Sequence, residues 1–169
     1  TMWTYPLPAE TCDPLHSEQT ANVALAPDGT IYTTGAKDWQ STVTHLSQDG
    51  ALISEKAFFG VRLFALVVAA DGDLLLGGSA AASGDIGGGV LEATSGTGLM
   101  VARLGPAFEH RWSSAFSNYF SDNNVTSIAA DPSGAVHFAG THYGIIDVGG
   151  TPMGISHGRF DAIIGTFTP

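Results

Sequence analysis

The chain has 169 residues, of which 44% are hydrophobic, 13% are charged and 22 are glycine. Its formal net charge of −10 repels phosphate backbones, so we expect no nucleic-acid partner. Its longest apolar run, 63–70, is much shorter than the roughly 20 residues that a membrane span requires, so we expect no membrane span. Few charges, many glycines and short apolar runs favour an all-β protein with many turns.

The first part of the chain predicts one isolated strand and then a four-stranded unit. Residues 1–8 alternate as a strand does, and Pro6 and Pro8 confine this strand to the edge of a sheet. Residues 9–20 are polar and irregular, which is typical of a connector. The first unit, residues 21–60, is predicted to contain four strands: 23–26, 31–34, 41–46 and 51–58.

Two further units follow. The second unit, residues 61–118, is predicted to have strands at 64–69, 74–76, 99–104 and 110–116, with a glycine-rich loop at 77–98. The third unit, residues 119–169, is predicted to have a hairpin around Asp131-Pro-Ser-Gly134, a loop at 141–158 and a strand at 160–167. A fourth strand is missing from this last unit.

One hairpin pattern recurs in the three units. An apolar run, a turn containing aspartate and a second run that ends in glycine occur at 22–35, 66–78 and 125–140. Units of four antiparallel strands that repeat in this way are typical of the blades of a β-propeller. We predict that the strand at 1–8 completes the last blade, because Met2-Trp-Thr-Tyr-Pro is similar to Arg111-Trp-Ser-Ser-Ala in the second unit.

A known repeat family has the same features. Ala129-Ala-Asp-Pro-Ser-Gly-Ala-Val-His-Phe-Ala-Gly140, followed by Asp147-Val-Gly-Gly150 and by the strand at 160–167, resembles the bacterial β-propeller repeat called SBBP. The resemblance implies that 1–169 is a β-propeller, or part of one, in an exported or cell-surface protein. It implies no particular activity, because one fold can carry many functions.

The number of repeats raises the question of partners. Three blades are fewer than the four to eight that are typical of a propeller. Three alternatives remain open: the chain assembles with itself or its relatives, it belongs to a longer array of blades, or it closes as a three-bladed monomer. A closed oligomer is attractive because closed symmetry is common among oligomers. The expected partner is therefore the chain itself or further blades.

The sequence offers no convincing catalytic group. Gly154-Ile-Ser-His-Gly158 has the letters of a nucleophile elbow, but that motif requires a preceding strand and a following helix, and here a loop precedes and a strand follows. The histidines and the single cysteine show neither His-x-x-x-His nor Cys-x-x-Cys spacing. We therefore predict a non-catalytic binding or structural module that acts through its blade loops and its assembly.

Carboxylates suggest a candidate calcium site. Asp71 and Asp73 form a dense cluster of oxygen atoms in one hairpin turn, and Asp85 and Asp147 precede Gly-Gly in corresponding loops. Ca²⁺ takes carboxylate and carbonyl oxygens as ligands, so these four residues are candidate Ca²⁺ ligands. The alternative is that each aspartate stabilises its own turn through hydrogen bonds to the backbone.

Loop aromatics suggest a candidate ligand site. Trp39 follows Asp38 in the first unit, and Tyr143 follows His142 in the third. His142 also lies five residues after His137, so these two histidines could meet one ligand. An aromatic ring beside polar groups can stack on a sugar or anchor a protein partner. The alternative function is therefore a carbohydrate-binding lectin, with or without assistance from Ca²⁺.

Overall fold

The computed structural model describes residues 2, 4, 21–37, 39–91, 97–116, 123–148, 151–153 and 160–168. All regular secondary structure in these ranges is β, so the all-β prediction is confirmed. Within the same ranges there is no helix of the length and apolarity needed to cross a membrane. The closing strand predicted at 1–8 lies outside the described residues except for Met2 and Thr4, which are exposed and belong to no strand.

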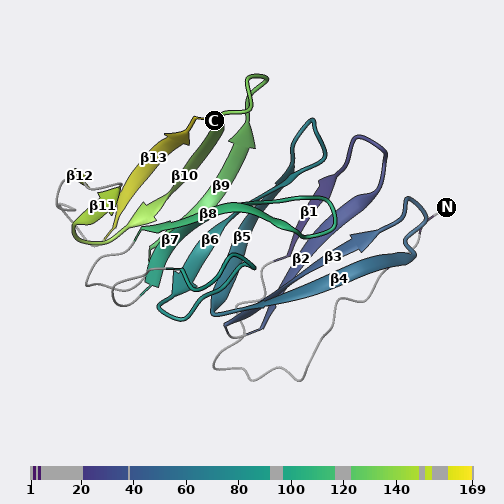
Figure 1. The fold of residues 1–169 in the computed structure, drawn as a ribbon, viewed down its shortest axis with the longest axis horizontal. Coiled ribbons are helices and arrows are strands. Elements are labelled where there is room, and N and C mark those ends of the chain that lie inside the picture. The colour runs from purple at the N-terminus through teal and green to yellow at the C-terminus, as the bar shows by residue number, and fades with distance from the viewer. Residues whose placement is uncertain are drawn as a thin grey trace.

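Three antiparallel sheets follow one another along the chain, and Figure 1 shows them side by side from right to left. The first contains β1 (Asn22–Leu25), β2 (Ile31–Lys37), β3 (Gln40–Leu46) and β4 (Leu52–Phe59). The second contains β5 (Val61–Val68), β6 (Leu74–Ala81), β7 (Thr97–Leu104) and β8 (His110–Phe116). The third contains β9 (Asn124–Ala130), β10 (Val136–His142) and β13 (Asp161–Phe167), in the order β13-β10-β9.

Two of the predicted loops contain more regular structure than expected. In the segment 77–98, β6 continues to Ala81 and β7 begins at Thr97. In the segment 141–158, β11 (Ile146–Val148) and β12 (Thr151–Met153) pair as a small hairpin. The first difference arises because glycines in β6 pair across the sheet as ordinary strand residues do. The second arises because Ile146 is fully buried in the apolar cluster that the second and third sheets share.

The hairpin turns are stabilised by their own aspartates. Asp131 Oδ1 accepts hydrogen bonds from the backbone N–H groups of Ser133 (2.8 Å) and Ala135 (3.1 Å) and from the Ser133 hydroxyl (2.6 Å). These bonds, with that from the hydroxyl the largest cause, lower the pKa of Asp131 to about 2. Asp28 accepts equivalent bonds from Thr30. The turns are therefore specified locally, as the sequence predicted.

The core consists of two apolar layers, one on each face of the second sheet. Tyr32, Val43 and Phe58 of the first sheet pack against one face of the second. Val125 and Phe138 of the third sheet pack against the other. The second sheet is therefore covered on both faces, which explains why β6 is an almost continuous apolar run rather than an alternating one.

His45 makes the first sheet sensitive to pH. Its ring stacks on Tyr32 with 4.0 Å between centroids, its Nε2 lies 2.9 Å from Thr30 Oγ1, and burial lowers its pKa from 6.5. The imidazole of His45 therefore takes up a proton more readily in the unfolded chain than in the folded one. The free energy of unfolding is thus highest above pH 6.5 and decreases as the pH falls below that value. We expect lower urea midpoints at pH 5 than at pH 7, and a smaller difference in His45→Phe, which keeps the stack. An equal difference in both proteins would contradict this assignment.

Candidate functional site

A cavity of about 520 Å³ lies where the three sheets meet. It is at the end of the sheets where β5 and β9 begin and where β6 and β10 finish. We call it the three-sheet pocket. Its described lining comes from all three sheets: Trp39, Arg62, Phe64, Ser79, Thr97, Asn124, Thr126, Thr141 and Phe160.

Trp39 forms the wall contributed by the first sheet. It occupies the turn between β2 and β3, and its carbonyl oxygen accepts a 2.6 Å hydrogen bond from Gly60 N–H at the start of the second sheet. The Arg62 guanidinium lies 4.3 Å from the centre of the Trp39 ring system, which is a cation–π contact. The side chain remains 37% exposed. The structure thus places Trp39, one of the predicted ligand residues, at a cavity.

Two β-bulges direct side chains into this pocket. In β5 the pairing with β6 shifts between Leu63 and Ala65, which leaves Phe64 as the extra residue. In β9 the pairing with β10 shifts in the same way and leaves Thr126 as the extra residue. Phe64 and Thr126 both line the pocket, because a bulge changes the direction of the side chain that it releases from pairing.

A glycine faces each bulge. A Cβ atom on Gly78 would overlap the carbonyl oxygen of Arg62, and a Cβ atom on Gly140 would overlap that of Asn124. The bulged strands therefore approach their partners too closely for any side chain. Glycine at the end of the second hairpin strand accompanies both bulges, but Gly35 holds the corresponding position in the first hairpin without a bulge, so the sequence alone did not identify Phe64 and Thr126.

Ser79 belongs to the wall of the pocket, but its hydroxyl oxygen is buried and does not open onto the cavity. Its side chain is 1% exposed, and its Oγ is the one fully buried side-chain polar atom without a hydrogen-bond partner in the described part of the chain. Buried hydroxyl groups in proteins are normally paired. Asn124 and Thr141, which face each other across β9 and β10, add an amide and another hydroxyl to the lining.

The other predicted ligand residues are placed differently. His142 is buried, and its Nδ1 donates a 3.1 Å hydrogen bond to the carbonyl of Gly144, so it supports the chain and is not among the residues that line the pocket. The centroid of the Tyr143 ring lies 6.0 Å from that of Phe160, which lines the pocket, but Tyr143 is not itself among the described lining residues. Asp38 lies outside the described residues.

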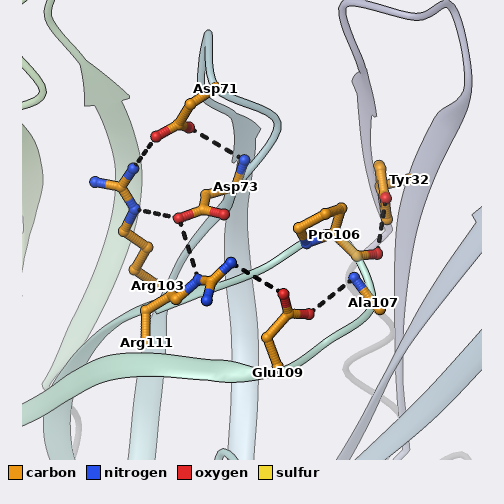
Figure 2. Close-up of polar contacts among 8 residues, drawn as sticks. All are labelled: Tyr32, Asp71, Asp73, Arg103, Pro106, Ala107, Glu109 and Arg111. Atoms are coloured by element: carbon orange, nitrogen blue, oxygen red, sulfur yellow. Dashed lines mark hydrogen bonds and ion pairs between the residues drawn. The ribbon is translucent and has the colours of Figure 1, made fainter.

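A charged network occupies the opposite end of the second sheet (Figure 2). Arg103 forms ion pairs with Asp71 and, at 2.8 Å, with Asp73. Arg111 Nε lies 3.6 Å from Asp73 Oδ2, and Arg111 Nη2 forms an ion pair with Glu109 Oε1 at 3.0 Å. Asp71 and Asp73, two of the four predicted Ca²⁺ ligands, thus have arginine partners. Asp71 also accepts a hydrogen bond from the backbone N–H of Asp73.

The remaining candidate ligands are dispersed. Asp85 Oδ1 accepts hydrogen bonds from Gly87 N–H (2.6 Å) and Gly89 N–H (3.1 Å), which is the turn-stabilising role of an aspartate. Asp147 is part of β11, but its side chain lies outside what the structure describes, as does the whole segment 154–158. Across the described ranges, no group of three or more His, Cys, Asp or Glu side chains is arranged to hold a metal ion.

Comparison with known proteins bears on the fold alone. No protein-family model matches the chain, and no curated protein matches it, so the resemblance to the SBBP repeat stays a prediction. One similar solved structure is described as a protein of unknown function from Bacteroides caccae, with a TM-score of 0.52 and 14% sequence identity. The match covers 85% of this chain and 44% of the other.

Proposed function

We propose that this chain is a non-catalytic binding and structural module whose three sheets are consecutive β-propeller blades, and that it assembles with a second copy through its two end faces. The observation that carries the proposal is a contrast in exposure between corresponding positions. Val23 and Leu66 each lie three residues before the alanine that opens their hairpin turn. Leu66 is 6% exposed against the first sheet, whereas Val23 is 73% exposed.

The other end of the stack shows the same contrast. Val101 in β7 pairs with the residue just before Gly78, and Ile164 in β13 pairs with the residue just before Gly140. Because Gly78 and Gly140 hold the same place in their hairpins, Val101 and Ile164 occupy corresponding positions in the second and third sheets. Val101 is fully buried against the third sheet, whereas Ile164 is 79% exposed. Each end of the stack thus presents the apolar side chains that are buried between neighbouring sheets in the interior.

The two end faces are complementary to each other. The second sheet packs on the first with one face and on the third with the other. The free face of the first sheet is equivalent to the face of the second sheet that contacts the first. The free face of the third sheet is equivalent to the face of the second sheet that contacts the third. A second copy can therefore stack head to tail, and such stacking gives a closed ring when the rotation between copies completes a full turn. The exported or cell-surface location that the SBBP resemblance implies forms part of this proposal.

Light scattering on a sizing column tests the assembly. We expect a mass of at least twice the 17.4 kDa of one chain for the wild type. Ile164→Asp and Val23→Asp should each shift the mass to that of one chain, because burying an unpaired carboxylate in an apolar interface is strongly unfavourable. Val90→Asp is the matched control, since Val90 is 65% exposed and lies in a loop outside both end faces. A wild-type chain that is monomeric at 100 μM (~1.7 mg/ml) would contradict self-assembly.

A further inference from the structure

We propose that the edge of β13 takes up residues 1–8 of a second copy of this chain as an added antiparallel strand. This inference rests on the head-to-tail assembly proposed above and names a second contact between the copies, besides their apolar end faces. In the first and second sheets, β3 and β7 each pair with a strand on both sides. In the third sheet β13 pairs with β10, and the described residues place no strand on its other side.

The edge of β13 carries none of the features that normally prevent a further strand from pairing. Its residues Asp161–Phe167 pair with β10 in one unbroken register, without a bulge. Its side chains from Ala162 onward include no charge and no proline. The outermost strands β4 and β8 of the other two sheets carry charges such as Lys56 and Arg111, and each contains a bulge. Because charges, prolines and bulges protect sheet edges, β13 is a template for strand addition.

The sequence of residues 1–8 matches the strand that occupies the equivalent position in the second sheet. Met2-Trp-Thr-Tyr-Pro is similar to Arg111-Trp-Ser-Ser-Ala of β8, and β8 pairs with β7 on the side that is open in β13. Proline is tolerated in the outermost strand of a sheet, which is the place that Pro6 and Pro8 would take. The segment therefore has the pattern of the strand that β13 lacks.

The pairing in the second sheet also gives the register of the added strand. Arg103 pairs with the second residue of β6, and Thr166 pairs with the second residue of β10, so these two positions correspond. Trp112 pairs with Arg103, which places Trp3 opposite Thr166. The centroid of the Trp112 ring lies 5.2 Å from that of Phe167, across the junction between the second and third sheets. Trp3 would thus pack at the next junction, which is the one between two copies.

The position of the sheets favours donation by a second copy. The first and third sheets lie at opposite ends of the row of sheets (Figure 1). In a head-to-tail stack, the first sheet of the next copy lies against the third sheet of this one, so the segment that precedes it is close to β13. The added strand is also continuous with the proposed end face, because Ile164, 79% exposed on that face, belongs to β13.

Cross-linking between two single-cysteine chains tests the added strand. Both chains carry Cys12→Ser; one then carries Tyr5→Cys and the other Ile164→Cys, which the register places opposite each other. A short bis-maleimide should join these unlike chains about tenfold faster than when Pro132→Cys replaces Ile164→Cys, because strand pairing holds the thiols at a high effective concentration. Pro132 is a matched control, since it is exposed in the hairpin turn of the same sheet.

A chain with both Tyr5→Cys and Ile164→Cys distinguishes exchange between copies from closure within one chain. At a concentration where the wild type assembles, we expect covalent multimers rather than one internally linked chain. A product with the mass of one linked chain, or a rate equal to that of Pro132→Cys, overturns the proposal. If cross-linking fails while light scattering still shows an assembly that Val23→Asp dissociates, the end-face assembly stands and the added strand is rejected. A monomeric wild type with no cross-linking rejects both.

Discussion

Replacing either Gly78 or Gly140 with alanine should destabilise the protein by about 3 kcal/mol, as overpacking against a rigid backbone does. In both cases the new methyl group would overlap a backbone carbonyl oxygen of the bulged strand, that of Arg62 or of Asn124. A backbone carbonyl cannot rotate away as the end of a side chain can, so the two strands must separate or the bulge must be lost. Urea unfolding monitored by tryptophan fluorescence measures the effect.

Gly35 is the control for this pair. It occupies the corresponding position of β2, but a Cβ atom there would meet nothing within 4 Å, and the pairing of β2 with β1 ends one residue earlier, at Thr34, without a bulge. Gly35→Ala should therefore change the free energy of unfolding by no more than about 0.5–1 kcal/mol, with stabilisation as the expected sign. A loss at Gly35 as large as that at Gly78 would show that glycine is required for some other reason.

Local sequence patterns were sufficient for the fold class and for the hairpins. The turns at Asp28 and Asp131 contain the hydrogen bonds that bind each aspartate to its own backbone, within two to four residues along the chain. Such contacts depend only on neighbouring residues, so a single sequence reveals them. The alternation of β3 was likewise readable, because one face of that strand is buried and the other is less so.

The pocket and the charged network could not be predicted in the same way. Arg103 reaches Asp71 and Asp73 across 32 and 30 residues, so the ion pairs depend on the register of β6 and β7. Without that register, the two aspartates in one turn suggested either a Ca²⁺ site or hydrogen bonds to their own turn. Phe64 and Thr126 were missed because a bulge changes which face a side chain occupies, and simple alternation assigns such residues to the wrong face.

Ser41→Ala should destabilise the protein by about 2–3 kcal/mol, whereas Ser79→Ala should leave its stability within about 0.5 kcal/mol of the wild type. Both hydroxyls are buried, with exposed fractions of 0% and 1%. Ser41 Oγ donates to Val61 C=O and accepts from Leu63 N–H, both at 3.1 Å, and so joins the first sheet to β5.

The difference between the two serines isolates hydrogen bonding from burial. Alanine at position 41 removes both hydrogen bonds that this hydroxyl makes to the buried backbone of β5, and losing the buried partner of a polar group costs roughly 1–3 kcal/mol. Alanine at position 79 removes a hydroxyl that has no partner in the described structure, so nothing is left unpaired. Urea unfolding of the two variants measures both effects. Equal losses at the two sites would show that the Ser79 hydroxyl has a hydrogen-bond partner in the folded protein.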